Sequence, residues 1–129
     1  MTSRNAAPAL RFMLRDYRIY MNFGLLSRLG CPLYLEFLYE DERKLLAISG
    51  SMKKRKCSFE IPERIYRDAG EECCVSRMPL SEAFRIRMKW NKNESYRVVG
   101  EYIKHLGVVV FDLTTAIVVT KENVYQSLS

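Results

Sequence analysis

The chain has few of the residues on which metal sites and disulfide frameworks depend. Its 129 residues include four cysteines, which are Cys31, Cys57 and the adjacent pair Cys73 and Cys74. No two of them have the Cys-x-x-Cys spacing of a zinc or redox motif. The sequence therefore predicts free thiols, no disulfide framework and no bound metal.

Motifs for catalysis are also missing. The chain contains no GxSxG, HExxH, Walker or GxGxxG motif, and its six glycines are scattered. Its one histidine, His105, stands in KHLG without an adjacent nucleophile, whereas a catalytic imidazole needs an orienting partner and a pocket. The neighbouring carboxylates at 40–42 and 71–72 fall in expected turns. We therefore expect a protein that is not an enzyme and that needs no cofactor.

Long apolar runs are absent as well. The longest apolar stretch, residues 107–119, contains Asp112 and is shorter than the roughly 20 residues that cross a bilayer. The N-terminal segment MTSRNAAPALRFMLRDYR lacks the continuous apolar region of a secretory signal and carries arginines in its later half. We expect no membrane partner and a cytoplasmic location.

What the chain does have is the composition of one basic globular domain. With 48% hydrophobic residues it is long enough to bury one core. The small and polar residues of 1–10 predict a flexible N-terminus, which leaves a single domain over 11–129. Lys and Arg outnumber Asp and Glu by 21 to 15, for a formal charge of +6. This charge favours an acidic partner such as nucleic acid.

The first third of the domain predicts strands and a short helix. In LRFMLRDYRIYM, a strand pattern with a turn near residue 16, we expect core positions at Phe12, Leu14, Ile19 and Met21. The following residues, FGLLSRLG, have apolar side chains at spacing three and end in a glycine, which is typical of a helix C-terminus. A short helix should therefore begin after Asn22.

Residues 33–49 predict a β-hairpin. Apolar residues alternate on both sides of the charged tip EDERK, and Leu35, Phe37, Leu46 and Ile48 are expected core positions. The tip lacks Gly and Asn, which favours a loop of about three to five residues over a tight turn. The MKKRKC segment after the hairpin carries four consecutive cations. Because like charges repel, this segment should be a solvated loop.

The second half of the chain repeats this order of elements. A short strand through Phe59 and Ile61 and a helical turn over 62–69 come first. A strand through Val75, a helix that begins near Pro79, a strand over 96–103, the turn KHLG and a long strand from 108 that bends near 114 follow. The order strand, helix, hairpin thus occurs over about 11–51 and again over about 73–120. A structural pseudo-repeat and a chance recurrence both stay open.

The element RIYMNFGLLSRLGCPLYLEFLYEDERKLLAIS resembles the AbrB/SpoVT (MazE-like) swapped-hairpin module. Ile19 and Tyr20 match its first strand, residues 25–30 its helix end and residues 35–48 its hairpin. Asn22 and Phe23 stand where the family usually has a proline before the helix, and FEIPERIYRDAG is similar to the family's Ile-Pro helix start.

The resemblance implies a swapped-hairpin-like barrel, built here as an internal pseudo-dimer or as a homodimer. It also implies DNA binding through arginines beside the helices. These would be Arg15, Arg18 and Arg28 in the first unit and Arg77, Arg85 and Arg87 in the second.

Two cationic segments are further candidates for nucleic-acid contacts. Lys53, Lys54, Arg55 and Lys56 either neutralise phosphates or form only a solvated loop. In RIRMKWNK, four cations surround Trp90, which either stacks on a base or packs in the core. These cations are Arg85, Arg87, Lys89 and Lys92.

We predict an α+β fold, mainly antiparallel, and carry two hypotheses about function. The first is a small DNA-binding transcriptional regulator of bacterial or mobile-element type, with duplex DNA as its partner. The second is a phage-type inhibitor or adaptor that binds a host protein and blocks a nucleic-acid enzyme such as a defence nuclease. A DNA-binding protein should gather its cations on one face, whereas an inhibitor should display an apolar or acidic patch.

Overall fold

The computed structural model describes residues 6–67 and 72–119. In chain order the elements are β1 (Ala9–Met13), the 3-10 helix η1 (Leu14–Asp16), β2 (Arg18–Met21), α1 (Phe23–Arg28), β3 (Tyr34–Glu40), β4 (Leu45–Ser51), β5 (Phe59–Glu60), α2 (Arg64–Arg67), β6 (Cys73–Ser76), α3 (Met78–Met88), β7 (Ser95–Val99), β8 (Glu101–Ile103), β9 (Val108–Asp112), η2 (Leu113–Thr115) and β10 (Ile117–Val118). Within these residues no helix has the length and apolarity to cross a membrane.

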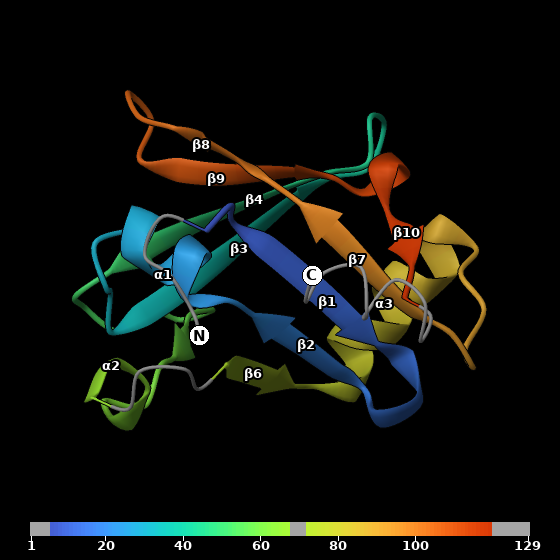
Figure 1. Cartoon of the computed structure of the whole chain (residues 1–129), viewed down its shortest axis with the longest axis horizontal. Helices are drawn as coiled ribbons and strands as arrows, with labels where there is room; N and C mark the ends of the chain where they lie inside the picture. The colour runs from blue at the N-terminus through green and yellow to red at the C-terminus, as the bar shows by residue number, and fades with distance from the viewer. Residues whose placement is uncertain (1–5, 68–71, 120–129) are drawn as a thin grey trace.

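The strands form two antiparallel sheets of five strands each (Figure 1). Sheet A has the order β10-β7-β1-β2-β6, and sheet B has the order β5-β3-β4-β9-β8. Inward side chains of both sheets meet in one hydrophobic core, to which α1 and α3 also contribute. This confirms the predicted α+β, mainly antiparallel fold. The described strands form two open sheets and no closed barrel.

The first two strands follow the predicted alternation. Phe12, Leu14, Ile19 and Met21 are all buried, and the 3-10 turn η1 stands where a turn was expected. The strand itself begins at Ala9, inside the stretch predicted as a flexible terminus, because residues 9 and 10 are buried and pair with β7. Residues 1–5 lie outside the described part of the chain.

Asn22 explains why α1 begins where it does. Its side-chain Oδ1 accepts hydrogen bonds from the backbone N–H of Leu25 and of Ala9, each at 3.0 Å. One amide therefore caps the helix and joins it to β1. At the other end Gly30 has a φ of 79°, a left-handed conformation that glycine adopts without strain. The helix predicted after Asn22 is confirmed.

The hairpin of β3 and β4 is also confirmed. Leu35, Leu46 and Ile48 are fully buried, whereas Phe37 is half-buried and packs on the Phe59 ring at 5.0 Å between centroids. Residues 41–44 form the tip between the paired residues at its base. The loop length therefore falls in the predicted range.

The stretch predicted as one strand over 96–103 is divided between the two sheets. β7 belongs to sheet A and β8 to sheet B, and Gly100 lies between them. A Cβ at Gly100 would lie 2.6 Å from the ring of Phe111, which is fully buried. Only a glycine therefore lets the chain pass this ring on its way from one sheet to the other.

One other predicted element differs in extent. α2 spans Arg64–Arg67 and is shorter than the helical turn expected over 62–69, whose last two residues lie outside the described part. The strand around Val75 and the helix with Pro79 in its first turn are present as predicted.

Corresponding strands of the two strand–helix–hairpin units pair with each other. β2 precedes α1 and β6 precedes α3, and these two strands pair antiparallel. The second strands of the two hairpins, β4 and β9, pair in the same way. Counted from the hairpin tips, Ala47 and Val110 hold corresponding positions, and they face each other at the middle of this ladder. This is the pairing that an internal two-fold axis through both sheets would give.

Candidate nucleic-acid interface

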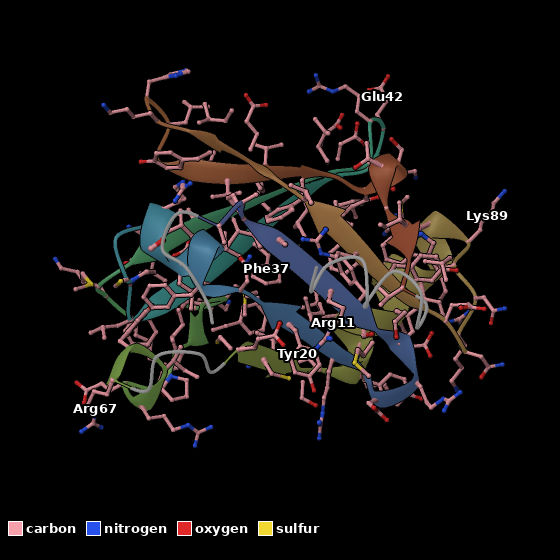
Figure 2. All side chains as sticks on the ribbon, in the orientation of Figure 1. Arg11, Tyr20, Phe37, Glu42, Arg67 and Lys89 are labelled. Atoms are coloured by element: carbon pink, nitrogen blue, oxygen red, sulfur yellow. The ribbon has the colours of Figure 1, made fainter. Side chains whose placement is uncertain are left out.

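The outward face of sheet A carries a row of aligned side chains across all five strands. Leu10 and Phe12 point into the core, so alternation places Arg11 on the opposite side of β1. Strand register then aligns Ile117, Arg97, Arg11, Tyr20 and Cys74. Figure 2 shows Arg11 and Tyr20 close together on this face.

A second row lies beside the first. It consists of Ser95, Met13, Arg18 and Ser76. We call these two rows the arginine face. All of its charged residues, Arg11, Arg18 and Arg97, are cations.

Arg11 and Arg97 stand directly opposite each other in the ladder of β1 and β7. Like charges at such a position destabilise a sheet unless counter-charges compensate them. Glu72 supplies part of the compensation, with 3.1 Å between its Oε1 and Nη2 of Arg11. The Arg11 guanidinium also lies over the Tyr20 ring, 4.6 Å from its centroid. Its Nε is buried and has no hydrogen-bond partner in the described residues.

Arg18 and Cys74 complete the surroundings of Tyr20. Arg18 Nη1 donates a hydrogen bond of 3.3 Å to the Tyr20 hydroxyl. Burial raises the pKa of the Cys74 thiol, which therefore stays protonated and uncharged at neutral pH. The arginine face thus keeps its positive charge next to an aromatic ring.

Two more of the predicted cations lie at the turn between β1 and β2, and a third ends α3. Arg15 is exposed in η1, and Lys92 Nζ lies 5.7 Å from the centroid of the Tyr17 ring in the same turn. Lys89 is exposed at the C-terminal end of α3, where Figure 2 shows it at the edge of the molecule.

Arg85 and Arg87 have carboxylate partners. Arg85 Nε lies 2.6 Å from Oε2 of Glu82, and Arg87 Nη1 lies 3.3 Å from Oδ1 of Asp41 at the hairpin tip. The hydrogen bond from Lys44 and the charges of Lys44 and Arg87 lower the pKa of Asp41. The pair of Arg87 and Asp41 is exposed, and such pairs are weak because water and salt screen them, whereas the pair of Arg85 and Glu82 is partly buried.

The remaining predicted cations lie elsewhere. The loop between β4 and β5 exposes Lys53, Lys54, Arg55 and Lys56, and Arg55 Nε lies 3.4 Å from Oε1 of Glu36. Figure 1 places this loop and the C-terminal end of α3 at opposite ends of the molecule. Arg28 ends α1, and Arg77 lies over the Phe59 ring at 4.7 Å. The predicted set is therefore not one continuous surface.

Sequence reasoning missed Arg11 and Arg97 as site residues. Alternation with buried neighbours was a sufficient signal that each points away from the core. Their position opposite each other depends on the pairing of β1 with β7, which no local pattern encodes. Trp90, by contrast, packs against the core, which was one of the two interpretations of this residue. Its ring centroid lies 5.0 Å from that of Phe12, and it stacks on the Tyr96 ring at 4.7 Å between centroids.

Other chemistry finds little support among the described residues. All four cysteines are free, as predicted, and no group of three His, Cys, Asp or Glu side chains within 6–67 and 72–119 could hold a metal ion. His105 is exposed in the turn between β8 and β9. Comparisons with protein-family models, curated proteins and solved structures find no match for this chain.

Proposed function

We propose that the protein is a small DNA-binding regulator that contacts phosphates through the arginine face. The observation that carries this proposal is the pair Arg11 and Arg97 on neighbouring strands. Glu72 compensates this pair only in part, through Arg11, and the remaining positive charge is repulsive across the ladder. A phosphate bound between them removes this repulsion and releases condensed counterions from the DNA.

The surroundings of this pair support the same function. Arg18 extends the positive charge to the next strand, and Tyr20 adds a polar aromatic side chain beside Arg11 in the first row. Arg15 and Lys92 extend it toward the turn between β1 and β2. A sheet face with these contacts binds mainly the DNA backbone, so affinity depends steeply on salt and weakly on sequence. The antiparallel pairing of β2 with β6 and of β4 with β9 supports an internal two-fold arrangement like that of a dimeric regulator.

The test is a salt titration with a fluorescein-labelled DNA duplex, followed by anisotropy. Arg97→Gln should weaken binding and reduce the slope of log affinity against log salt by about 0.9, because one phosphate fewer is neutralised. Arg11→Gln/Arg97→Gln should reduce it about twice as much. Arg43→Gln is the matched control, because it removes the same charge from an exposed side chain at the hairpin tip.

Replacing Lys53, Lys54, Arg55 and Lys56 by Ser tests the competing cationic surface. If the slope falls in this variant and not in the two arginine variants, DNA binds at the β4–β5 loop. A wild-type protein that binds no duplex at low salt would contradict the proposed function altogether.

A second candidate function is a protein-binding inhibitor or adaptor. One observation favours it, namely that Leu38 is exposed among carboxylates on the outward face of sheet B.

A further inference from the structure

The outward face of sheet B combines apolar side chains with carboxylates. One row across the sheet consists of Leu38, Ala47, Val110 and Glu101. The next row consists of Glu36, Ser49, Val108 and Ile103. A third row, on one side of these two, consists of Glu40, Leu45 and Asp112. A fourth row, on the other side, consists of Glu60, Tyr34 and Ser51. We call these four rows the acidic face.

Every charged residue of the acidic face is a carboxylate. These residues are Glu36, Glu40, Glu60, Glu101 and Asp112. Two of them contact cations of the adjoining loops, since Glu36 lies 3.4 Å from Arg55 and Glu40 lies 3.5 Å from Arg43. Glu60 and Glu101 are exposed, and neither forms an ion pair with any residue in the described part of the chain. A chain with a net charge of +6 thus carries one face of the opposite sign.

The apolar part of this face is continuous. Leu38 is 74% exposed, and its cross-strand neighbour Ala47 is too small to cover it. Val110 continues the row, and Ile103 and Val108 lie in the next row. A single exposed leucine needs no explanation, but a leucine at the end of an apolar row across three strands marks an interaction surface.

We propose that the acidic face binds a protein partner whose contact segment carries apolar side chains flanked by Lys or Arg. Charge complementarity selects this chemistry, because the carboxylates around the apolar row favour cations on the partner. The same carboxylates repel nucleic acid and anionic lipid. They also oppose the docking of a second copy by its own acidic face, since like charges would then meet across the interface. The cationic nucleic-acid-binding surface of another protein has the required chemistry.

The inference does not depend on DNA binding by the arginine face. The two faces lie on opposite sides of the two-sheet core, so the ligand of one does not overlap the ligand of the other. A variant of one face should therefore leave the ligand of the other face unaffected. This independence makes failure of the two proposals distinguishable.

The probe is a fluorescein-labelled amphipathic helical peptide of Leu and Lys, with a control peptide in which Glu replaces every Lys. Binding is followed by anisotropy, and the contact surface is mapped by amide chemical shifts of the ¹⁵N-labelled protein. The Lys peptide should shift amides of β3, β4 and β9, and the Glu peptide should not. Leu38→Ser should weaken binding by about tenfold or more, as expected when a large exposed apolar anchor is removed from an interface.

Leu106→Ser is the matched control, because Leu106 is 64% exposed in the β8–β9 turn and lies outside the acidic face. It should bind the peptide like the wild type. Glu101→Lys should weaken peptide binding and leave the protein folded, since Glu101 is exposed. DNA affinity should be unchanged in all three variants.

Three outcomes would overturn the inference. The first is that no amides of sheet B shift. The second is that Leu38→Ser and Leu106→Ser bind equally well. The third is a mass in analytical ultracentrifugation that rises with concentration for the wild type and not for Leu38→Ser, which would assign the face to a second copy of this chain.

Discussion

The outward faces of the two sheets differ in charge although the same alternation of inward and outward residues builds both. On sheet A the charged outward residues are the arginines 11, 18 and 97. On sheet B they are carboxylates that surround an apolar row. The formal charge of +6 describes neither face. The partners that we propose therefore follow from how charge is distributed between the faces rather than from its sum.

Both faces depend on one shared hydrophobic core, and disruption of this core should have the largest effect. Phe12 is fully buried and contacts the rings of Phe84 and Trp90, at 5.5 and 5.0 Å between centroids. Phe12→Ala should lower the free energy of unfolding by about 3–5 kcal/mol and weaken the binding that we propose for each face. Phe37→Ala, at a half-buried site, should cost about 1–2 kcal/mol. Urea unfolding measures both, and equal losses would contradict this assignment of the core.

Exchanging charge between the faces separates the effect of each face from the effect of net charge, which stays constant. Arg97→Glu/Glu101→Arg keeps the formal charge of +6 and moves negative charge onto the arginine face. It should abolish the salt-dependent binding of duplex DNA, because Arg11 would then face a carboxylate. It should also weaken binding of the Lys peptide. Unchanged DNA affinity in this double variant would mean that net charge, and not the arginine face, determines binding.

Local patterns predicted the strands, the core and the capped helix. They did not predict the point at which the chain passes from sheet A to sheet B. Residues 96, 98 and 102 alternate with outward residues as in one continuous strand. The alternation continues across Gly100, although the chain changes sheet there. A glycine inside a strand pattern was the one available signal. Its reason, the ring of Phe111, becomes visible only once β9 folds back along β8.

The candidate site shows the same limit. Predictions from charge clusters named Lys53–Lys56 and the cations around Trp90, because consecutive cations are visible in sequence. Arg11 and Arg97 are isolated in sequence and meet only through the register of β1 and β7. Likewise, the carboxylates of the acidic face come from different strands of sheet B. Residues of such a surface become neighbours only when strands pair in a particular register. Composition and local spacing do not reveal this register.

A smaller effect separates the two sides of β6. Cys73 points inward and is buried, whereas its neighbour Cys74 is exposed on the arginine face. Burial raises the pKa of Cys73 from the ordinary 9.0 to about 11. The unfolded chain therefore releases this proton first, and the stability that Cys73 contributes should fall as pH rises from about 9 toward 11.

Urea unfolding between pH 7 and pH 10.5 tests this expectation. Cys73→Ala should reduce the alkaline loss of stability, and Cys57→Ala, at an exposed thiol of the β4–β5 loop, serves as the control. In the folded protein, iodoacetamide should modify Cys57 and Cys74 before Cys73. Rapid modification of Cys73 under native conditions would show that the inward side of β6 is accessible to the reagent, which contradicts the burial of Cys73.

The smallest expected effect is that of His105→Ala. His105 is exposed in the β8–β9 turn, which belongs to neither the arginine face nor the acidic face. A catalytic imidazole needs an orienting partner within hydrogen-bond distance and a pocket for the reacting group. We therefore expect His105→Ala to leave DNA affinity, peptide affinity and the melting temperature unchanged. If a biological activity of the chain is lost in this variant while both binding reactions and the fold persist, then the protein has a chemical function that neither face explains.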